Sequence, residues 1–210
     1  MHENTAAGYD AIAKEYATRL FHELDGKPFD REFLATFERS APPGTILDLG
    51  CGPGHVAKFL SKAGRQVTGI DISRAMVAEA QKLAGGLDFR QGDMCALDIP
   101  SACCAGVVAF YSIIHLEPDE IAQALREIHR VLIPGGIAAL AFHVGDEVRH
   151  VDELWGAKTS LDFHFLSPAV VEEELRAAGL QVTVCKTRQP YAPQVEAQTK
   201  RCYVLAMREH

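Results

Sequence analysis

The stretch Ile46-Leu47-Asp48-Leu49-Gly50-Cys51-Gly52-Pro53-Gly54-His55 decides the fold. A short strand-like run leads into three alternating glycines, and apolar residues at helical spacing follow at Val56, Phe59 and Leu60. Alternating glycines let the backbone approach a ligand without interference from Cβ atoms. A strand, a glycine-rich turn and a helix in this order predict a ligand site at the carboxyl edge of an α/β sheet.

The rest of the chain continues the alternation of strands and helices. Helical spacing occurs between successive apolar runs, which is typical of a parallel sheet. The last two runs are joined through Gln189-Pro190-Tyr191-Ala192-Pro193, which is too short for a crossover helix, so we expect an antiparallel hairpin there. The expected strands are Thr45–Leu49, Gln66–Ile70, Leu87–Gln91, Gly106–Tyr111, Ile137–Phe142, Gln181–Lys186 and Cys202–Met207.

Composition and charge exclude several classes of protein. The chain has 210 residues and a formal net charge of −7, which disfavours nucleic acid as a partner. Its longest apolar stretches, around Ala102–Tyr111 and Ile137–Phe142, are shorter than the roughly 20 residues that a membrane-spanning helix needs. Met-His-Glu-Asn at the start does not resemble a secretory signal, so we expect a cytoplasmic protein. The six cysteines form no Cys-x-x-Cys pair, and no residue set has metal-binding spacing, so no metal is expected.

Four motifs together resemble those of class I S-adenosylmethionine-dependent methyltransferases. They are Asp48-x-Gly50-x-Gly52-x-Gly54, Asp71 at the end of the second strand, Asp93-Met94 after the third, and Pro134-Gly135-Gly136 before the fifth. The resemblance implies an α/β fold with a seven-stranded, mostly parallel sheet in the order 3-2-1-4-5-7-6. In that fold strand 7 is antiparallel, as the terminal hairpin predicts, and helices cover both faces.

The resemblance implies S-adenosyl-L-methionine as cofactor and suggests which residues contact it. Asp71 would accept the ribose hydroxyl protons and Asp93 would accept from the adenine amino group. Asp48 would orient the amino group of the methionine part, directly or through water. Tyr9 and Tyr16, on one face of a predicted helix, could cover the cofactor. The full expected set is Tyr9, Tyr16, Asp48, Gly50, Cys51, Gly52, Asp71, Ile72, Met76, Asp93, Met94 and Tyr111.

We expect a single methyltransferase domain over residues 1–210. Residues 1–40 would form an N-terminal helical lid, with helices at Ala6–Arg19 and Arg31–Arg39, and 41–145 the cofactor-binding core. Residues 146–166 form a possible substrate lid, and 167–210 a C-terminal helix and the antiparallel hairpin.

Two other functions fit parts of the pattern. An NAD(P)-dependent oxidoreductase would also use Asp71, but its fingerprint places a third glycine or an alanine where this chain has His55. A non-catalytic cofactor-binding protein would keep the same pocket without turnover. A nucleotide-binding Walker loop is excluded because no Gly-Lys-Ser/Thr follows the glycines.

The acceptor of the methyl group is expected to be a small organic molecule, and its nucleophile is an oxygen, nitrogen, sulfur or carbon atom that the sequence does not identify. The Asn/Asp-Pro-Pro-Tyr/Phe motif of enzymes that methylate nucleic-acid bases or glutamine is absent after strand four, which carries Tyr111-Ser112-Ile113-Ile114. His115 and His143 follow strands four and five, where each could act as a general base or could satisfy loop backbone. An apolar wall is suggested by four aromatic residues, Trp155, Phe163, Phe165 and Tyr191. The sequence does not predict an oligomeric state.

Overall fold

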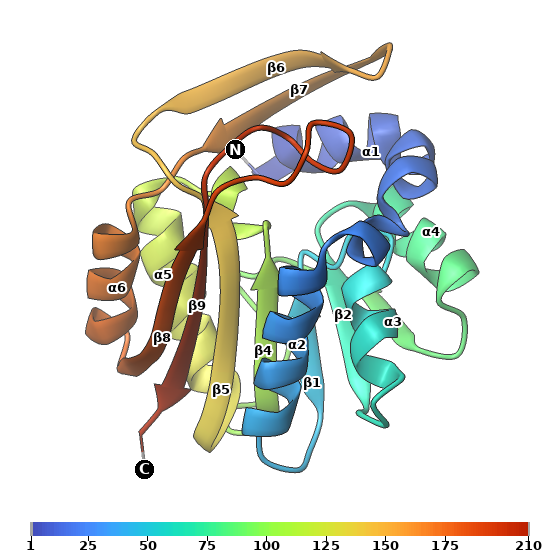
Figure 1. Ribbon diagram of the computed structural model, residues 1–210. Coiled ribbons are helices and arrows are strands. Elements are labelled where there is room, and N and C mark those ends of the chain that lie inside the picture. The colour runs from blue at the N-terminus through green and yellow to red at the C-terminus, as the bar shows by residue number, and fades with distance from the viewer. Residues whose placement is uncertain (1, 210) are drawn as a thin grey trace.

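The computed structural model describes residues 2–209 and contains one seven-stranded sheet. Figure 1 shows the strands side by side in the order β3-β2-β1-β4-β5-β9-β8. This is the predicted order once a separate hairpin, β6–β7, is left out of the numbering. As predicted, the last strand of the chain, β9, runs antiparallel to both of its neighbours. The strands are β1 (Ile46–Leu49), β2 (Val67–Asp71), β3 (Asp88–Gln91), β4 (Cys104–Phe110), β5 (Leu132–His143), β8 (Leu180–Arg188) and β9 (Arg201–Arg208).

Helices cover both faces of the sheet, and each face has its own apolar core. One core packs residues of α2 (Pro28–Ser40), α3 (His55–Ser61) and α4 (Arg74–Leu83) against the strands. The other core packs α5 (Pro118–Val131) and α6 (Pro168–Ala177) against the opposite face. The helix α5 begins at Pro118, and a capping box between Glu117 and Glu120 explains this start.

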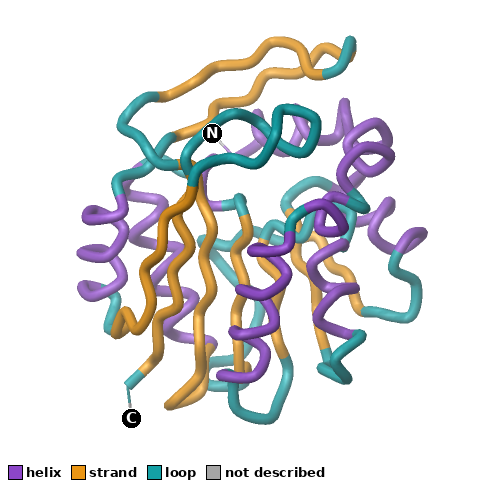
Figure 2. Tube along the Cα trace, viewed as in Figure 1, coloured by secondary structure: helices purple, strands orange, loops and turns teal. Residues whose placement is uncertain are grey.

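Two further layers lie beyond the carboxyl ends of the parallel strands. The helix α1 (His2–Leu20) begins before the expected Ala6 and continues into the short helix η1 (Glu23–Gly26). Above α1 lies a hairpin of β6 (Val148–Leu154) and β7 (Ala157–His164), as Figure 2 shows. The sequence predicts a lid here and no strands. Exposed residues dominate β6, whereas β7 alternates exposed residues with less exposed ones, of which only Leu161 and Phe163 are large and apolar. The apolar alternation that predicts a half-buried strand is therefore too short to be recognised.

No helix within the described residues 2–209 is long and apolar enough to cross a membrane.

Candidate functional site

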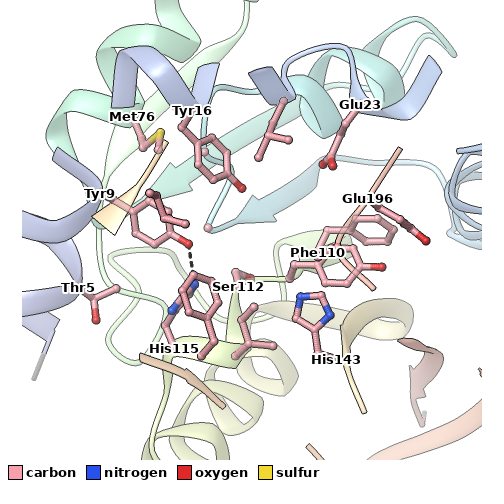
Figure 3. Close-up of a pocket in the computed structure, with 18 of the residues that line it drawn as sticks. Thr5, Tyr9, Tyr16, Glu23, Met76, Phe110, Ser112, His115, His143 and Glu196 are labelled. Carbon is pink, nitrogen blue, oxygen red and sulfur yellow. Dashed lines mark hydrogen bonds between the residues drawn. The ribbon is translucent and has the colours of Figure 1, made fainter. Parts of the chain in front are cut away.

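A cavity of about 660 Å³ lies beyond the carboxyl ends of the parallel strands. The strand-to-helix turns form its floor. Its walls and roof come from α1, the β6–β7 hairpin and the segment 193–201, which carries the chain into β9 (Figures 1 and 3). The short helix η2 (Ile113–His115) follows β4 and completes the floor.

The glycine-rich turn adopts a backbone that other residues would strain. Gly50, Gly52 and Gly54 have φ angles of 68°, 51° and 84°. A Cβ atom on Gly50 would lie 2.2 Å from the Ser112 Cβ, and one on Gly54 would lie 2.7 Å from the Phe89 ring. The turn is held to β2 because the amides of Gly50 and Cys51 both donate to the Ile70 carbonyl, at 2.7 and 3.1 Å. Gly50 and Gly52 line the cavity directly.

Asp71 ends β2 and faces the same cavity. One carboxylate oxygen accepts from the Gly52 amide at 2.7 Å and the other accepts from the Ser73 amide at 2.8 Å. Burial raises the pKa of Asp71 to about 6, although these two hydrogen bonds oppose the shift. Each oxygen keeps a lone pair for a ligand. Four more of the expected cofactor residues line this end of the cavity: Ile72, Met76, Asp93 and Met94.

Two expected contacts lie behind the turn, outside the cavity lining. The Asp48 carboxylate is buried and accepts from the Ala57 amide at 3.0 Å, so it supports the start of α3. The Cys51 side chain packs into the core shared by α2, α3 and α4. Asp48 is thus not among the residues that line the cavity, and its expected role toward the methionine amino group, directly or through water, stays a prediction.

Tyr9 and Tyr16 project from α1 into the cavity, and Figure 3 shows them along one side of it. Their ring centroids are 5.7 Å apart. The Tyr9 hydroxyl lies 2.7 Å from Nε2 of His115. The other ring nitrogen of His115, Nδ1, lies 2.7 Å from the Asp162 carbonyl. Because a carbonyl can only accept, Nδ1 carries the hydrogen, and the neutral ring accepts from Tyr9 at Nε2.

The two histidines that were candidate bases have different surroundings. Burial lowers the pKa of His115 to about 4, and both of its nitrogens are already bonded. His115, in η2, therefore links α1 through Tyr9 and β7 through Asp162. His143 stacks on Phe165 with ring centroids 5.5 Å apart, and its Nδ1 bonds the Thr199 hydroxyl at 2.8 Å. Burial, followed by the charges of Arg201 and Lys27, lowers the pKa of His143 to about 3.

A buried group of charges borders the cavity near His143, and no sequence motif marked it. Glu23 pairs with Lys27 at 2.5 Å and with His55 at 2.9 Å. Glu196 pairs with Arg201 at 3.2 Å and lies 3.8 Å from Lys27. These residues come from η1, the start of α3, two loops and the start of β9. Only the folded chain brings them together.

Tyr111 lies beside this group and has a backbone φ of 56°, in the left-handed region. Its hydroxyl lies 2.8 Å from that of Tyr203, which in turn donates to Asp30 at 3.1 Å. Three of the four aromatic residues expected in the wall, Trp155, Phe163 and Phe165, line the cavity. The fourth, Tyr191, does not, because its hydroxyl is turned to the Phe29 amide, from which it accepts at 2.9 Å.

Residues 46–136 match a family model described as a methyltransferase domain. This match and the methyltransferase relatives support a class I S-adenosylmethionine-dependent methyltransferase. A malonyl-[acyl-carrier protein] O-methyltransferase of Pseudescherichia vulneris is 30% identical over 155 residues, which are 74% of this chain and 59% of that protein. The chain thus spans less than two thirds of the length of this methyltransferase relative.

Solved structures share the methyltransferase fold over nearly the whole chain. The complex of DhpI with SAH matches with a TM-score of 0.74 and 22% identity, covering 99% of this chain and 97% of that one. The [4+2]-cyclase SpnF matches with a TM-score of 0.75 and 19% identity, covering 100% of this chain and 97% of that one. At these identities the likeness concerns the fold.

Proposed function

We propose that this chain binds S-adenosyl-L-methionine in the cavity and transfers its methyl group to a small organic acceptor. The observation that carries the proposal is the wall formed by Gly50, Gly52, Asp71 and Asp93. It combines a backbone free of side chains with carboxylates that can accept hydrogen bonds, as a ribose and an adenine require.

The residues that line the cavity match the chemical groups of this cofactor. The Asp71 oxygens, already oriented by the Gly52 and Ser73 amides, would accept from the two ribose hydroxyls. Ile72, Met76 and the backbone of Met94 would surround the adenine, with Asp93 accepting from its amino group. Tyr9 and Tyr16 would cover the cofactor from α1. Asp48 would act indirectly, by holding the turn through Ala57.

When bound, S-adenosyl-L-methionine supplies an electrophilic methyl group on a positively charged sulfur. The residues of this chain would hold the acceptor in line with that methyl group, at roughly 3–3.5 Å. Tyr111, His143 and Phe165 form the neighbouring wall. Water would be kept out by α1, the hairpin and the 193–201 segment, which together close the cavity.

Isothermal titration calorimetry with S-adenosylhomocysteine tests the cofactor assignment. We expect binding by the unmodified chain and affinity lower by about tenfold or more in Asp71→Asn, because an amide oxygen replaces only one of the two acceptors. Asp88→Asn, an exposed carboxylate on the neighbouring strand, is the matched control and should bind normally. NAD is the competing ligand. Heat from NAD and none from S-adenosylhomocysteine would favour the oxidoreductase alternative.

Transfer of labelled methyl groups into a metabolite mixture then separates an enzyme from a non-catalytic binding protein. Because fold alone does not establish turnover, this measurement is needed in addition to binding. We expect label in small molecules and none in added nucleic acid. A protein that binds the cofactor but labels nothing would contradict the enzymatic proposal.

A further inference from the structure

The loop between β2 and α4 is tied to the N-terminal helix by a carboxylate that no motif marked. The helices α1 and α4 pack against each other, as Figure 1 shows on one side of the molecule. Asp10 on α1 accepts two hydrogen bonds there, from the Ser73 hydroxyl at 2.6 Å and from the Ala75 amide at 2.9 Å. These partners lie 63 and 65 positions away in the sequence.

The two bonds complete the N-terminal cap of α4. This helix begins at Arg74, and the first amides of a helix have no acceptor within it. The Ser73 hydroxyl accepts from the Met76 amide at 3.1 Å, and Asp10 accepts from the Ala75 amide. A carboxylate at this end is favoured by the helix dipole and forms strong hydrogen bonds. Asp10 therefore fixes the start of α4 from a separate helix.

Ser73 connects this cap to the expected ribose acceptor, Asp71. Ser73 is fully buried, and while its hydroxyl donates to Asp10, its backbone amide donates to Oδ1 of Asp71 at 2.8 Å. The other carboxylate oxygen, Oδ2, accepts from the Gly52 amide at 2.7 Å. One oxygen of Asp71 is thus positioned by the glycine-rich turn, and the other is positioned by a residue that α1 holds.

The part of the loop before Ser73 is held by β3 and the turn that follows it. The Gly92 amide donates to the Asp71 carbonyl at 3.0 Å, and the Gln91 side-chain amide donates to the Ile72 carbonyl at 3.1 Å. Neither bond involves α1. Loss of the contact with α1 would therefore leave this backbone in place and would affect chiefly Ser73 and the oxygen of Asp71 that Ser73 orients.

The residue that precedes Asp10 on α1 contacts the cavity itself. Tyr9 lines the cavity, and its hydroxyl lies 2.7 Å from Nε2 of His115. Neighbouring residues of one helix therefore make two contacts at once, Tyr9 with the cavity floor and Asp10 with the cap of α4. Placement of α1 both covers the cavity and supports Asp71.

We propose that Asp10 is a positioning residue for the cofactor, which acts through Ser73 on Asp71. This inference rests on the proposed binding of S-adenosyl-L-methionine. When α1 is in place, Asp10 fixes the Ser73 hydroxyl, and the Ser73 amide holds Oδ1 of Asp71 where it accepts from a ribose hydroxyl. When α1 moves away, the Ser73 hydroxyl loses its acceptor and Asp71 loses part of its support. The position of α1 and the affinity for the ribose are therefore coupled, and each favours the other.

Calorimetry with two ligands on the full chain tests the proposal. The probes are S-adenosylhomocysteine and its analogue without the two ribose hydroxyls, at pH 8, where Asp71 with its pKa of about 6 is ionised. We expect the unmodified chain to prefer S-adenosylhomocysteine by about tenfold or more. In Asp10→Ala this preference should fall severalfold, because only the ligand with hydroxyls depends on Asp71. If Asp10 had a purely structural role, both ligands would weaken by the same factor, and such an unchanged preference would overturn the proposal.

Three further variants test the route through Ser73. Asp10→Asn keeps an oxygen for both donors, so it should retain most of the preference. Ser73→Ala removes the connecting hydroxyl and should lower the preference as Asp10→Ala does. Glu15→Ala removes a partly exposed acid of α1 that pairs with Arg19 on the same helix, and this matched control should keep the full preference. An equal loss in Asp10→Asn and Asp10→Ala, or no loss in Ser73→Ala, would contradict the route.

The unmodified chain separates this inference from the proposed function. If it does not bind S-adenosylhomocysteine, the proposed function is wrong. If it binds both ligands equally, Asp71 does not hold the ribose, and the role of Asp10 is overturned with it. If it prefers S-adenosylhomocysteine and Asp10→Ala keeps that preference, the role of Asp10 alone is overturned. Circular dichroism of each variant at the assay temperature verifies that the compared proteins are folded.

Discussion

Asp48 shows how a single buried carboxylate supports the site without touching it. Its exposed fraction is 1%, and it accepts a hydrogen bond from Ala57 at the start of α3. Burial raises its pKa to about 7, opposed by the charge of His55 and by the Ala57 hydrogen bond. The folded protein therefore binds this proton more tightly than the unfolded chain does. The stability that this proton contributes is present below pH 4 and is lost as the pH rises to about 7.

Asp48→Asn should remove this pH dependence. Asparagine keeps an oxygen for the Ala57 amide but cannot ionise. The free energy of unfolding should then fall less steeply between pH 5 and 7, by up to about 1.4 kcal/mol per pH unit. Urea unfolding at several pH values measures the slope. Asp88→Asn, on the exposed edge of the sheet, should leave the slope unchanged, and an equal slope in both variants would contradict the assignment.

The sequence predicted the parts of the site that depend on local backbone. Gly50, Gly52 and Asp71 belong to strand ends and tight turns, whose conformational needs are visible in residue type and spacing. Lys27, Glu196 and Arg201 could not be predicted in this way. They meet only after the chain has folded, and isolated charged residues in loops resemble ordinary surface residues.

At the scale of elements, the contact between α1 and the hairpin is the feature that closes the cavity. The Thr159 hydroxyl donates to the Gly8 carbonyl at 2.8 Å. The tip of the hairpin carries Trp155, whose ring lies 5.8 Å from that of Tyr16 and 5.5 Å from the Arg19 guanidinium. The order of the main sheet could be predicted from strand patterns, but this contact could not, because β6 is mostly exposed and the apolar alternation of β7 is limited to Leu161 and Phe163.

Gly8→Ala should separate α1 from the hairpin. A Cβ atom on Gly8 would lie 2.7 Å from Leu161 Cδ2 and 2.9 Å from the Ser160 carbonyl oxygen. Trp155 is the only tryptophan in the sequence, so its fluorescence reports this contact directly. We expect a red-shifted emission and faster quenching by acrylamide. Gly85→Ala adds the same methyl group at the end of α4, 3.4 Å from the nearest atom, and should leave the emission unchanged.

At the scale of the whole molecule, three segments far apart in the sequence enclose one cavity. Residues 5–27, the hairpin and the 193–201 segment surround it, and His115 connects the first two through Tyr9 and Asp162. We propose that residues 1–40 and 146–166 act as lids that open for exchange of the cofactor. Ligand binding to the closed form would then stabilise the lids as well as the core.

Limited proteolysis tests the lids. Trypsin should cut after Lys158, an exposed residue of the hairpin, and S-adenosylhomocysteine should slow this cut severalfold. NAD at the same concentration is the control ligand and should have no effect. Cutting at equal rates with and without S-adenosylhomocysteine would show that the hairpin does not respond to the cofactor.

The buried bonds of Asp30 imply an order of events during biosynthesis. Asp30 on α2 pairs with Arg188 at 2.8 Å and accepts from Tyr203, so its partners leave the ribosome more than 150 residues later. Until then this carboxylate lacks the guanidinium and the hydroxyl that bond it directly, and α2 has an incomplete surface to pack on. Nascent chains released early would therefore expose the unpaired face of α2 to chaperones and proteases.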